Sequence, residues 1–579
     1  MAASYQGLRQ TAIAVAREAG AHLLRDFRRP GGARGGGSHA DADEEAERLI
    51  RDRLLAATPG FGFLGEETGR VEGEPGRPIW VVDPNDGTAA YLRGFRGSST
   101  SIALVAEGTP VLGVVFAYAW PDDEGELFAW AEGDPMAAPA STGVVFVSQD
   151  ADRNAPANAR CVAPAGRFFA LPSVAHRLAR VGAGDGDGAV CLSGCASWDV
   201  AAGHALLRGR GATLVDEHGR PFRYDAKAEG SLRFGFAGPP SLVAVMAQNP
   251  WDDVRRRGGP ASPLVEPRRG HGVADVARLR RCQGLWLGQL IGDALGAQVE
   301  FQSSAEISAR HPEGVRALRD GGTWGTLAGQ PTDDSELALA LARSLVDRGG
   351  YDVEAVRAAY LAWLGSSPFD VGATVSGGLR GRPNPDSLAN GALMRVSPIA
   401  LALARDPRAA IAAARVDAAL THVHPACADA NAVYVAALIA ALDGASREEI
   451  VGAALAEPIT ARHVHAVVEA ARDGAPRDYV THQGFYAIAL QNAFFQLLHA
   501  PSFEEGLVDT VGRGGDTDTN ACIAGALLGA FHGRPAIPAD WLRAVLTCRP
   551  LAEVGASRVR RMDYWPVDAL LLAERLAER

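Results

Sequence analysis

The chain has 579 residues, of which 47% are hydrophobic and 22% are charged, as is typical of soluble globular proteins. Its net charge of −11 argues against general binding to nucleic acids or anionic membranes. No uninterrupted apolar run reaches the roughly 18 residues that span a bilayer. The seven Cys residues form no CxxC pair, which predicts reduced thiols. We therefore expect a cytoplasmic protein with no nucleic-acid partner and no membrane partner.

The N-terminal half begins with helical patterns and continues with short β-rich runs. Apolar spacing predicts helices over residues 4–28 and 43–57, and residues 172–206 return to helical spacing. Four runs between them have strand character: 61–64, 79–82, 101–105 and 111–118. We therefore expect a layered α/β (α+β) domain over residues 1–255.

Residues 256–275 are rich in Arg, Gly and Pro and predict a linker. Beyond it, residues 276–579 predict an all-α domain, because no strand pattern competes with helical spacing. The predicted helices are 276–297, 333–347, 353–364, 393–403, 408–420, 428–442, 447–456, 461–471, 486–498, 503–511 and 519–531. In the first of them Gly recurs every four residues, which indicates very close packing against another helix. These positions are Gly284, Gly288, Gly292 and Gly296.

Acidic residues gather at the ends of predicted strands in the N-terminal half. Glu66 follows one strand, Asp83 and Asp86 follow another, and Asp199 lies at the start of a helix. Carboxylates this dense repel one another unless a cation holds them, and oxygen ligands suit Mg²⁺. Two cations roughly 3.5–4 Å apart could activate water and neutralise a phosphate leaving oxygen.

These acids lie in three motifs that occur in one order: Gly65-Glu66-Glu67, Asp83-Pro84-Asn85-Asp86-Gly87-Thr88 and Trp198-Asp199-Val200-Ala201-Ala202-Gly203. In this the segment resembles the inositol monophosphatase-like, Mg²⁺-dependent phosphatase family over nearly all of residues 1–255. The resemblance implies that Glu66, Asp83 and the Asn85 carbonyl hold one Mg²⁺, and that Asp83, Asp86 and Asp199 hold a second. It further implies that the Gly87 and Thr88 amides receive the phosphate, while Glu67 and Thr88 help to position the attacking water. One departure is that the family's Thr ahead of Asp43 is missing.

A second acidic group lies at two predicted helix starts in the C-terminal half. Thr332-Asp333-Asp334 precedes one apolar helix, and Gly514-Gly515-Asp516-Thr517-Asp518-Thr519 precedes another. Thr and Asp are also ordinary N-caps, so either motif alone has a structural interpretation. Together, two such helix starts can converge on one di-metal site.

In this order, and in an all-helical segment, the two motifs resemble the ADP-ribosylglycohydrolase family, including the dinitrogenase reductase-activating glycohydrolases, over about residues 276–575. Further matches are Gly292-Asp293-Ala294-Leu295-Gly296 with Glu300, Asn390 to Arg395, Thr421-His422 and Gly525-Ala526. The resemblance implies that six residues bind two Mg²⁺, with Mn²⁺ as an alternative. They are Thr332, Asp333, Asp334, Asp516, Asp518 and Thr519.

The same resemblance implies roles around the bound ribose. Glu300 is the candidate gating or acid/base carboxylate, although a solvated Glu after a helix is the alternative. Gly391, Met394 and Arg395 are expected to border the ADP-ribose pocket. His422 is expected near the substrate, with a buried structural His as the alternative.

The sequence thus predicts a bifunctional Mg-dependent hydrolase with two cations in each domain. Its C-terminal half would hydrolyse an ADP-ribosyl bond of an ADP-ribosylated substrate or ADP-ribose derivative, or another glycoside of ribose. Its N-terminal half would hydrolyse a phosphate monoester of a small metabolite or nucleotide. The alternative is that one half is a non-catalytic metal- or nucleotide-binding module that regulates the other.

Overall fold

A computed structural model describes residues 5–578 except 38, 136–140, 164–165 and 256–261. The chain forms two compact units. Unit 1 is Met1–Ser262 with Glu266–Ala274, and unit 2 is Pro263–Val265 with Asp275–Arg579. Part of the predicted linker, 256–261, lies outside the described residues. Of its later part, Pro263–Val265 and Asp275 belong to unit 2 and Glu266–Ala274 to unit 1, where Arg269 Nη2 donates a hydrogen bond to the carbonyl of Ala33 at 2.9 Å.

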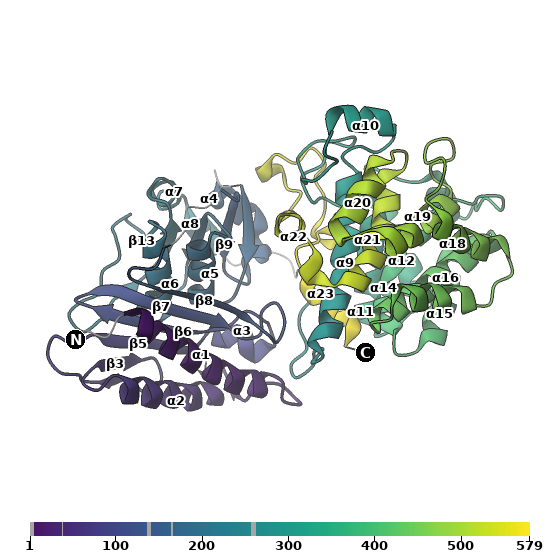
Figure 1. Ribbon diagram of the computed structural model, residues 1–579. Coiled ribbons are helices and arrows are strands. Elements are labelled where there is room, and N and C mark those ends of the chain that lie inside the picture. Colours follow the sequence, from purple (N-terminus) through teal and green to yellow (C-terminus); the bar gives the residue numbers. More distant parts are fainter. Residues whose placement is uncertain (1–4, 38, 136–140, 164–165, 256–261, 579) are drawn as a thin grey trace. The chain divides into compact units, whose positions relative to one another are not determined.

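Unit 1 is built on a six-stranded sheet in the order β4-β3-β5-β6-β7-β8. Its strands are β3 (Gly62–Gly65), β4 (Arg70–Val71), β5 (Ile79–Asp86), β6 (Ser99–Ala106), β7 (Thr109–Ala117) and β8 (Glu126–Ala131). β3 and β5 are parallel, and the other neighbours are antiparallel. Helices α1 (Tyr5–Phe27) and α2 (Asp41–Ala57) cover one face, and α5 (Val174–Ala183) and α6 (Ser197–Gly209) cover the other (Figure 1). The predicted α/β (α+β) layers of the N-terminal half are therefore confirmed.

A second sheet packs on the far side of α5 and α6, in the order β10-β9-β11-β15-β13. Its strands are β9 (Val144–Val147), β10 (Arg167–Ala170), β11 (Gly188–Cys191), β13 (Thr213–Asp216) and β15 (Gly235–Gly238). The expectation of helical structure throughout 172–206 was wrong at β11, which runs between the two helices. All four β11 residues are buried, and an apolar run this short carries no periodicity that separates strand from helix.

Shorter elements complete unit 1. They are β1 (Gly35–Gly36), β2 (His39–Ala40), α3 (Thr88–Arg93), the 3₁₀ turn η1 (Ala151–Asn154), α4 (Ala155–Val162), β12 (Cys195–Ala196), β14 (Ser231–Leu232), α7 (Pro240–Met246) and α8 (Trp251–Arg255). β12 pairs with β14 and leads directly into α6.

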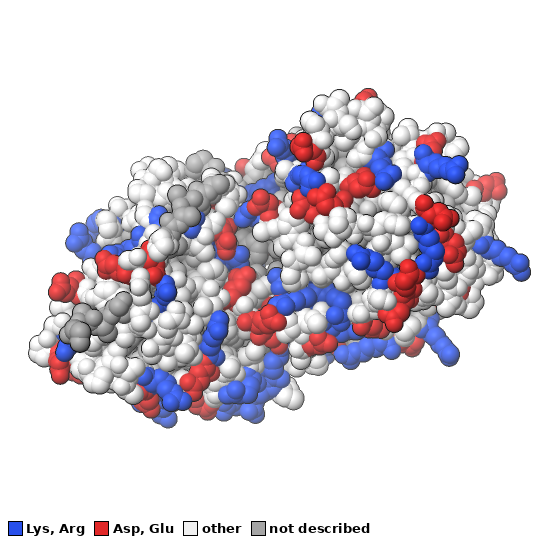
Figure 2. Space-filling model, in the orientation of Figure 1, with Lys and Arg blue, Asp and Glu red and all other residues white. Residues whose placement is uncertain are grey.

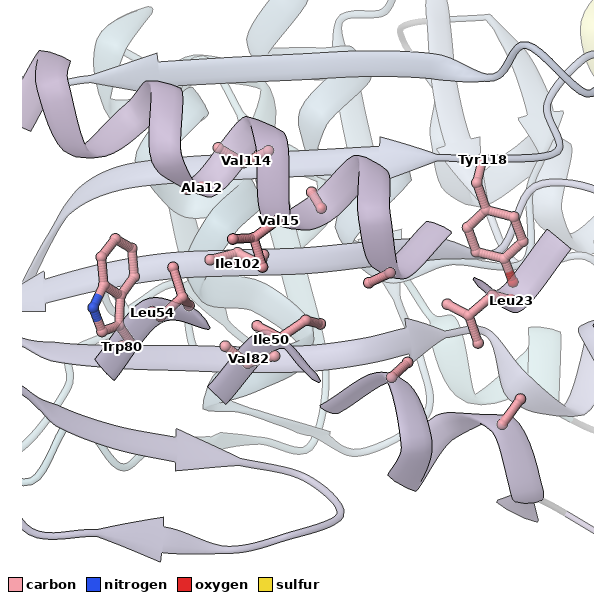
Figure 3. Packing of buried hydrophobic residues seen from close by; sticks show 14 of the residues in the cluster. Ala12, Val15, Leu23, Ile50, Leu54, Trp80, Val82, Ile102, Val114 and Tyr118 are labelled. Carbon is pink, nitrogen blue, oxygen red and sulfur yellow. The ribbon is translucent and has the colours of Figure 1, made fainter. Parts of the chain in front are cut away.

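The alternation of side chains along β5 directs Asp83 to one face of the sheet. Trp80 and Val82 pack into the core beneath α1 and α2 (Figure 3). Val81 points the opposite way and packs with residues of α5 and α6. Because the side-chain period of a strand is two, Asp83 follows Val81 toward the α6 face, where Asp199 lies.

Unit 2 is helical, and its described residues outside the helices form only isolated β-bridges. Its helices are α9 (Val276–Gly296), α10 (Ser304–Arg310), α11 (Asp333–Arg348), α12 (Val353–Gly365), α13 (Ala373–Leu379), α14 (Ser397–Leu403), α15 (Pro407–Ala419), α16 (Pro425–Leu442), α17 (Arg447–Ala456), α18 (His463–Asp473), α19 (Tyr486–His499), α20 (Phe503–Gly512), α21 (Thr517–His532), α22 (Ala539–Leu546) and α23 (Ala569–Ala577). Short 3₁₀ turns are η2 (Leu393–Arg395), η3 (Arg534–Ala536), η4 (Ala552–Val554) and η5 (Met562–Tyr564). The all-α prediction is confirmed, although α10, α13, α22 and α23 were not anticipated.

One helix among the described residues, α16, is long and apolar enough by composition to cross a membrane. It is 78% buried inside the protein, as expected of a core helix. Its buried residues include Asp429 and Asn431, which interrupt the apolar run.

Helices α9 and α21 cross with their backbones in direct contact, and the glycine repeat makes this possible. A Cβ added at Gly288 would overlap the carbonyl oxygen of Gly525, and one at Gly284 would overlap that of Gly529. At the C-terminal end of α9, a Cβ added at Gly296 would overlap the backbone of Thr517. The pairing is antiparallel, so the end of α9 meets the start of α21. The expected partner helix of the glycine repeat is therefore α21.

Replacing Gly288 by Ala is expected to destabilise unit 2, because the new methyl group has no space and the helices must separate. Overpacking of this kind costs about 1–3 kcal/mol of unfolding free energy. Gly452 in α17 provides the control, since a Cβ there meets nothing within 4 Å. Gly452→Ala should stabilise the chain by up to about 1 kcal/mol. Thermal unfolding of both variants measures the contrast, and an unchanged midpoint for Gly288→Ala would contradict the packing described.

Candidate metal centres

Carboxylates are gathered inside both units. On the face shown in Figure 2, acidic and basic side chains are interspersed. Among the described residues, three groups of acids bring ligand oxygens within 4.8 Å of one another. One group lies in unit 1: Asp83, Asp86 and Asp199. Two overlapping groups lie in unit 2: Asp293, Asp334 and Asp518, and Glu300, Asp370 and Asp518.

The unit 1 cluster is assembled from the end of β5 and the start of α6. The pairing of β5 with β6 is irregular between Asp83 and Asp86, so both carboxylates reach the same site. Asp199 lies in the first turn of α6, where its Oδ2 accepts a hydrogen bond from the Ala196 amide at 2.5 Å. Glu66 follows β3 and is the exposed member of the predicted ligand set.

Two neighbours that were not anticipated fix the orientation of Asp86. Its Oδ2 accepts hydrogen bonds from the Ser173 hydroxyl and from the Ala175 amide, each at 2.6 Å. Ser173 also caps α5 by accepting from the His176 amide at 2.9 Å. A Ser before a helical pattern signals an N-cap, but the sequence contains no signal that this Ser also contacts Asp86.

Burial and mutual repulsion prevent this cluster from carrying its full charge unaided. Burial, followed by the charge of Asp86, raises the pKa of Asp199 to about 8. Burial raises the pKa of Asp83 well above its usual range, and the charges of Glu66, Asp86 and Asp199 add to this. A divalent cation would remove this repulsion, and the donor set of carboxylate oxygens fits a hard ion such as Mg²⁺.

A chain of hydrogen bonds connects Thr88, Asn85 and Asp43 behind the cluster. The Thr88 hydroxyl lies 2.9 Å from the Asn85 carbonyl and 3.0 Å from Asp43 Oδ2. Asn85 Nδ2 donates to Asp43 Oδ1 at 2.9 Å, and its Oδ1 accepts from the Tyr118 hydroxyl at 2.5 Å. Burial raises the pKa of Asp43 to about 7. Gly87, with φ of 96°, makes the left-handed turn from which α3 begins at Thr88.

Glu67 lies beside the cluster and not within it. Its Oε2 is 3.4 Å from His39 Nδ1, and its amide donates to Glu47 Oε2 at 3.0 Å. His39 stands in the segment where the family's Thr is missing. The role of Glu67 in positioning water stays a prediction.

The unit 2 cluster forms where the end of α9 meets the starts of α11 and α21. Asp293, in the last turn of α9, accepts from the Thr332 hydroxyl at 2.8 Å and from the Thr332 and Ser335 amides at 3.1 Å. It therefore caps α11 from a neighbouring helix. Asp293 lies in the Gly292–Gly296 motif, from which no role was predicted for it. Burial raises its pKa to about 6.

Glu300 and Asp370 form the other side of this site, with Asp518 between the two groups. Trp324 Nε1 donates to Glu300 Oε2 at 2.5 Å. Burial raises the pKa of Glu300 to about 8, and it raises that of Asp370 to about 9 with help from the charge of Asp333. Asp370 was not predicted, because it lies in the loop between α12 and α13 without a motif or a periodic pattern.

The remaining predicted ligands surround the same site. Asp516 Oδ2 accepts from Asn390 Nδ2 at 2.7 Å, and Asp333 Oδ2 accepts from the Gly372 amide at 3.2 Å. The Thr519 amide donates to Asp518 Oδ1 at 2.9 Å.

Two buried oxygens in this site, Asp334 Oδ1 and Asp518 Oδ2, have no hydrogen-bond partner among the described residues. Unpaired buried carboxylate oxygens are costly, so their presence fits a site made for hard cations.

Of the predicted pocket residues, Gly391 and His422 lie together, since a Cβ at Gly391 would lie 3.2 Å from His422 Cε1. Burial lowers the pKa of His422 to about 3, so the ring is neutral, and its Nδ1 pairs with the Thr421 hydroxyl at 2.8 Å. Its Nε2 is buried without a partner among the described residues.

Arg395 is fully buried, and its guanidinium is bonded within the protein. It contacts the Asp417 carboxylate at 3.0 Å, the Gly391 carbonyl at 3.0 Å and the Thr421 hydroxyl at 3.0 Å. Met394 is also buried, and its carbonyl accepts from Gln289 Nε2 at 3.1 Å. Arg395 therefore supports the loop of Gly391 from behind. The expectation that Gly391, Met394 and Arg395 border the ADP-ribose pocket stays a prediction.

Stability without metal is expected to fall as the pH rises. Asp199 and Glu300 have folded-state pKa values of about 8, against about 4 in unfolded chains. Between these values the folded state binds more protons than the unfolded state, so the stabilisation present at low pH is lost as the pH rises through about 8. In chelator, the unfolding midpoint should drop between pH 5 and pH 8.5, and Mg²⁺ or Mn²⁺ should reverse the drop. K⁺ at equal ionic strength serves as the control, and equal midpoints at both pH values would contradict this account.

The folds of the two units, each with a cluster of acids at the ends of its helices and strands, define a two-domain hydrolase. The family model of the inositol monophosphatase family matches residues 4–232, and that of ADP-ribosylglycohydrolase matches residues 274–576. The chain therefore belongs to the ADP-ribosylglycohydrolase family in its C-terminal part and to the inositol monophosphatase family in its N-terminal part.

Individual relatives match one part each. An "ADP-ribosyl-[dinitrogen reductase] glycohydrolase" of Rhodospirillum rubrum is 34% identical over 278 residues, which are 45% of this chain and 89% of the relative. An "Inositol-1-monophosphatase" of Mesorhizobium japonicum is 33% identical over 229 residues, which are 36% of this chain and 84% of the relative. A solved "ADP-ribosylglycohydrolase-related protein complex" is 29% identical, covers 52% of this chain and 99% of its own, and has a TM-score of 0.43.

Proposed function

We propose that the protein carries two separate metal-dependent hydrolytic activities. Unit 2 would release ADP-ribose from an ADP-ribosylated substrate or ADP-ribose derivative, and unit 1 would release phosphate from a phosphorylated metabolite or nucleotide. The observation that carries the proposal is that each unit buries its own group of acids within 4.8 Å, on the motifs of a hydrolase family. The alternative, a regulatory half without catalysis, predicts one activity instead of two.

In unit 2 the residues that would hold two Mg²⁺ or Mn²⁺ are Thr332, Asp333, Asp334, Asp516, Asp518 and Thr519. Cations there supply a Lewis acid that polarises oxygen atoms and makes water more acidic. Asp293 keeps Thr332 and the start of α11 in place. Glu300 and Asp370, whose pKa values are raised to about 8 and 9, can each retain a proton near neutral pH or exchange it with water or a leaving group.

In unit 1 the residues that would hold Mg²⁺ are Glu66, Asp83, Asp86 and Asp199 with the Asn85 carbonyl. The Thr88 hydroxyl is hydrogen-bonded to both the Asn85 carbonyl and Asp43, so Asp43 can accept a proton passed through Thr88. The amides of Gly87 and Thr88 lie at the turn into α3, where a phosphate oxygen would meet N–H groups and not side chains.

The test is an assay of the full chain on two substrate panels. ADP-ribose release is measured from proteins ADP-ribosylated on different side chains, and phosphate release is measured from sugar phosphates, inositol phosphates and nucleotides. Both activities should appear with Mg²⁺ or Mn²⁺ and disappear in chelator. Loss of only one activity in chelator, or the presence of only one, would favour the regulatory alternative.

A further inference from the structure

A short segment near the C-terminus, Arg558 to Arg560, contacts two loops that form opposite walls of the unit 2 site. One wall carries Trp324, and the other carries Ser366 and Phe369. The segment lies between η4 and η5 and is absent from the motifs that predict the site. The Arg560 amide donates to the Pro550 carbonyl at 3.0 Å, and its carbonyl accepts from Trp565 Nε1 at 2.9 Å. The backbone of this segment is thus anchored on both sides.

Arg560 holds the loop that carries Asp370. Its guanidinium forms two hydrogen bonds with Glu336, at 2.7 and 2.6 Å, and their side chains are only 4% and 2% exposed. The same guanidinium donates to the Ser366 carbonyl at 3.1 Å and to the Ser366 hydroxyl at 2.9 Å. Ser367, the next residue, has a φ of 57°, a conformation that L-residues rarely adopt. Arg560 therefore fixes the start of the loop three residues before Phe369.

Arg558 holds the opposite wall. Its Nε donates to the Trp324 carbonyl at 2.9 Å, and its own carbonyl accepts from Gln330 Nε2 at 2.7 Å. Its guanidinium also lies over the ring of Phe369, 5.7 Å from the centroid. The rings of Trp324 and Phe369 are 6.0 Å apart, so the two walls touch where Arg558 spans them.

Each wall is connected to one acid of the site, Glu300 or Asp370. Trp324 donates to Glu300, and the loop of Phe369 continues into Asp370. Ligand oxygens of Glu300 and Asp370 lie within 4.8 Å of each other, so a shift of either loop would change their separation. A fully bonded buried ion pair such as Arg560–Glu336 restricts a loop to one conformation even when its net contribution to stability is small.

We propose that Arg558 and Arg560 are positioning residues for the reaction of unit 2, which hold Glu300 and Asp370 at their working separation. The kinetic part of this inference rests on the proposed glycohydrolase activity. The structural part, that the two arginines hold the loops of Glu300 and Asp370, does not. Neither arginine contacts the reacting atoms. Their loss should lower kcat more than it changes KM, because Asp293 still holds Thr332 and Ser335 at the start of α11, where the predicted ligands lie.

The first test measures hydrogen exchange of the full chain. Arg560→Met leaves Glu336 buried without a counterion, so a Glu336→Gln/Arg560→Met double variant, which removes both charges, keeps the test possible if the single variant unfolds. Amides of 366–372 should exchange at least tenfold faster in either variant. Arg415→Met is the matched control, since Arg415 pairs with buried Asp429 and holds the Pro458 carbonyl at 2.6 Å on another loop. Equal exchange of 366–372 in wild type and Arg560 variants would overturn the proposal.

The second test is kinetic. kcat for ADP-ribose release should fall about 10- to 100-fold in the Arg560 variants, with KM changed less than threefold, and Arg560→Lys should recover part of the loss. Arg558→Ala, at an exposed position, should lower kcat several-fold without unfolding. The Arg415→Met control should keep the wild-type kcat. A kcat for Arg560→Lys no better than that for Arg560→Met, or an equal loss in Arg415→Met, would reject a positioning role. A wild type without glycohydrolase activity would refute the proposed function instead, and the exchange measurement would still decide whether the segment holds the loop.

Discussion

Replacing Asp516 by Asn is expected to abolish the release of ADP-ribose, with a loss of about 10³-fold or more in kcat/KM, while phosphate release continues unchanged. Asp516 is buried among acids and accepts a hydrogen bond from Asn390. An amide in its place keeps the shape of the side chain but removes a negative charge, and its NH₂ group cannot bind a cation. Removal of a single group that stabilises developing charge costs about 10²- to 10³-fold, and a lost metal ligand is expected at or beyond the upper end of this range.

The measurement is ADP-ribose release over a range of Mg²⁺ or Mn²⁺ concentrations. Asp509→Asn is the control, because Asp509 lies on the neighbouring helix α20, is 44% exposed and pairs with Arg513. It should leave both activities at the wild-type level. If Asp516→Asn kept ADP-ribose release within tenfold of the wild type, Asp516 would not be a metal ligand.

Replacing Asp83 by Asn should have the opposite pattern, with phosphate release reduced by about 10³-fold or more and ADP-ribose release intact. Asp83 is the acid that the resemblance places between both cations of unit 1, and it lies 1% exposed beside Asp86 and Asp199. An Asn at this position carries no charge and needs no bound proton, so the variant avoids the repulsion that raises the pKa of Asp83 in the metal-free cluster. The variant should therefore unfold at a higher temperature than the wild type in chelator at pH 8, although it is inactive.

This combination of stabilisation and inactivity is the sharpest outcome for unit 1. Phosphate release and thermal unfolding are measured on the same preparations, with Asp150→Asn as the control for an acid that is 53% exposed. A variant that is inactive only because it is unfolded would show a lower unfolding temperature than the wild type, and this would contradict the prediction. If each of the two Asp→Asn changes reduced both reactions, one unit would regulate the other.

The sequence predicted the acids that stand beside regular elements. Asp83 follows an apolar strand and Asp516 precedes an apolar helix, so local spacing alone places them at the ends of those elements. Both families were recognised from the order of such motifs. The layered α/β fold of unit 1 and the helices of unit 2 followed from the same periodicities.

Residues whose place depends on contacts between distant segments could not be predicted. Asp370 lies in a loop with no periodic pattern, and its approach to Glu300 depends on packing against Trp324 and on the C-terminal segment. Ser173 reaches Asp86 across 87 positions of sequence. Strand β11 was missed because four buried residues are too few to show a period.

The contact between α9 and α21 has a consequence for how such proteins are recognised. Asp293 and Asp518 come together because the two glycine-lined helices touch in one register, and an α-helix turns about 100° for each residue. A single residue inserted into α21 between Thr519 and Gly525 would leave every motif readable in the sequence. It would rotate Asp516 and Asp518 away from Asp293 and move them about 1.5 Å along the axis. A sequence can therefore keep every motif and still lack an assembled metal centre. We expect the number of residues from Asp518 to Gly525 to matter for the metal centre as much as the acids themselves.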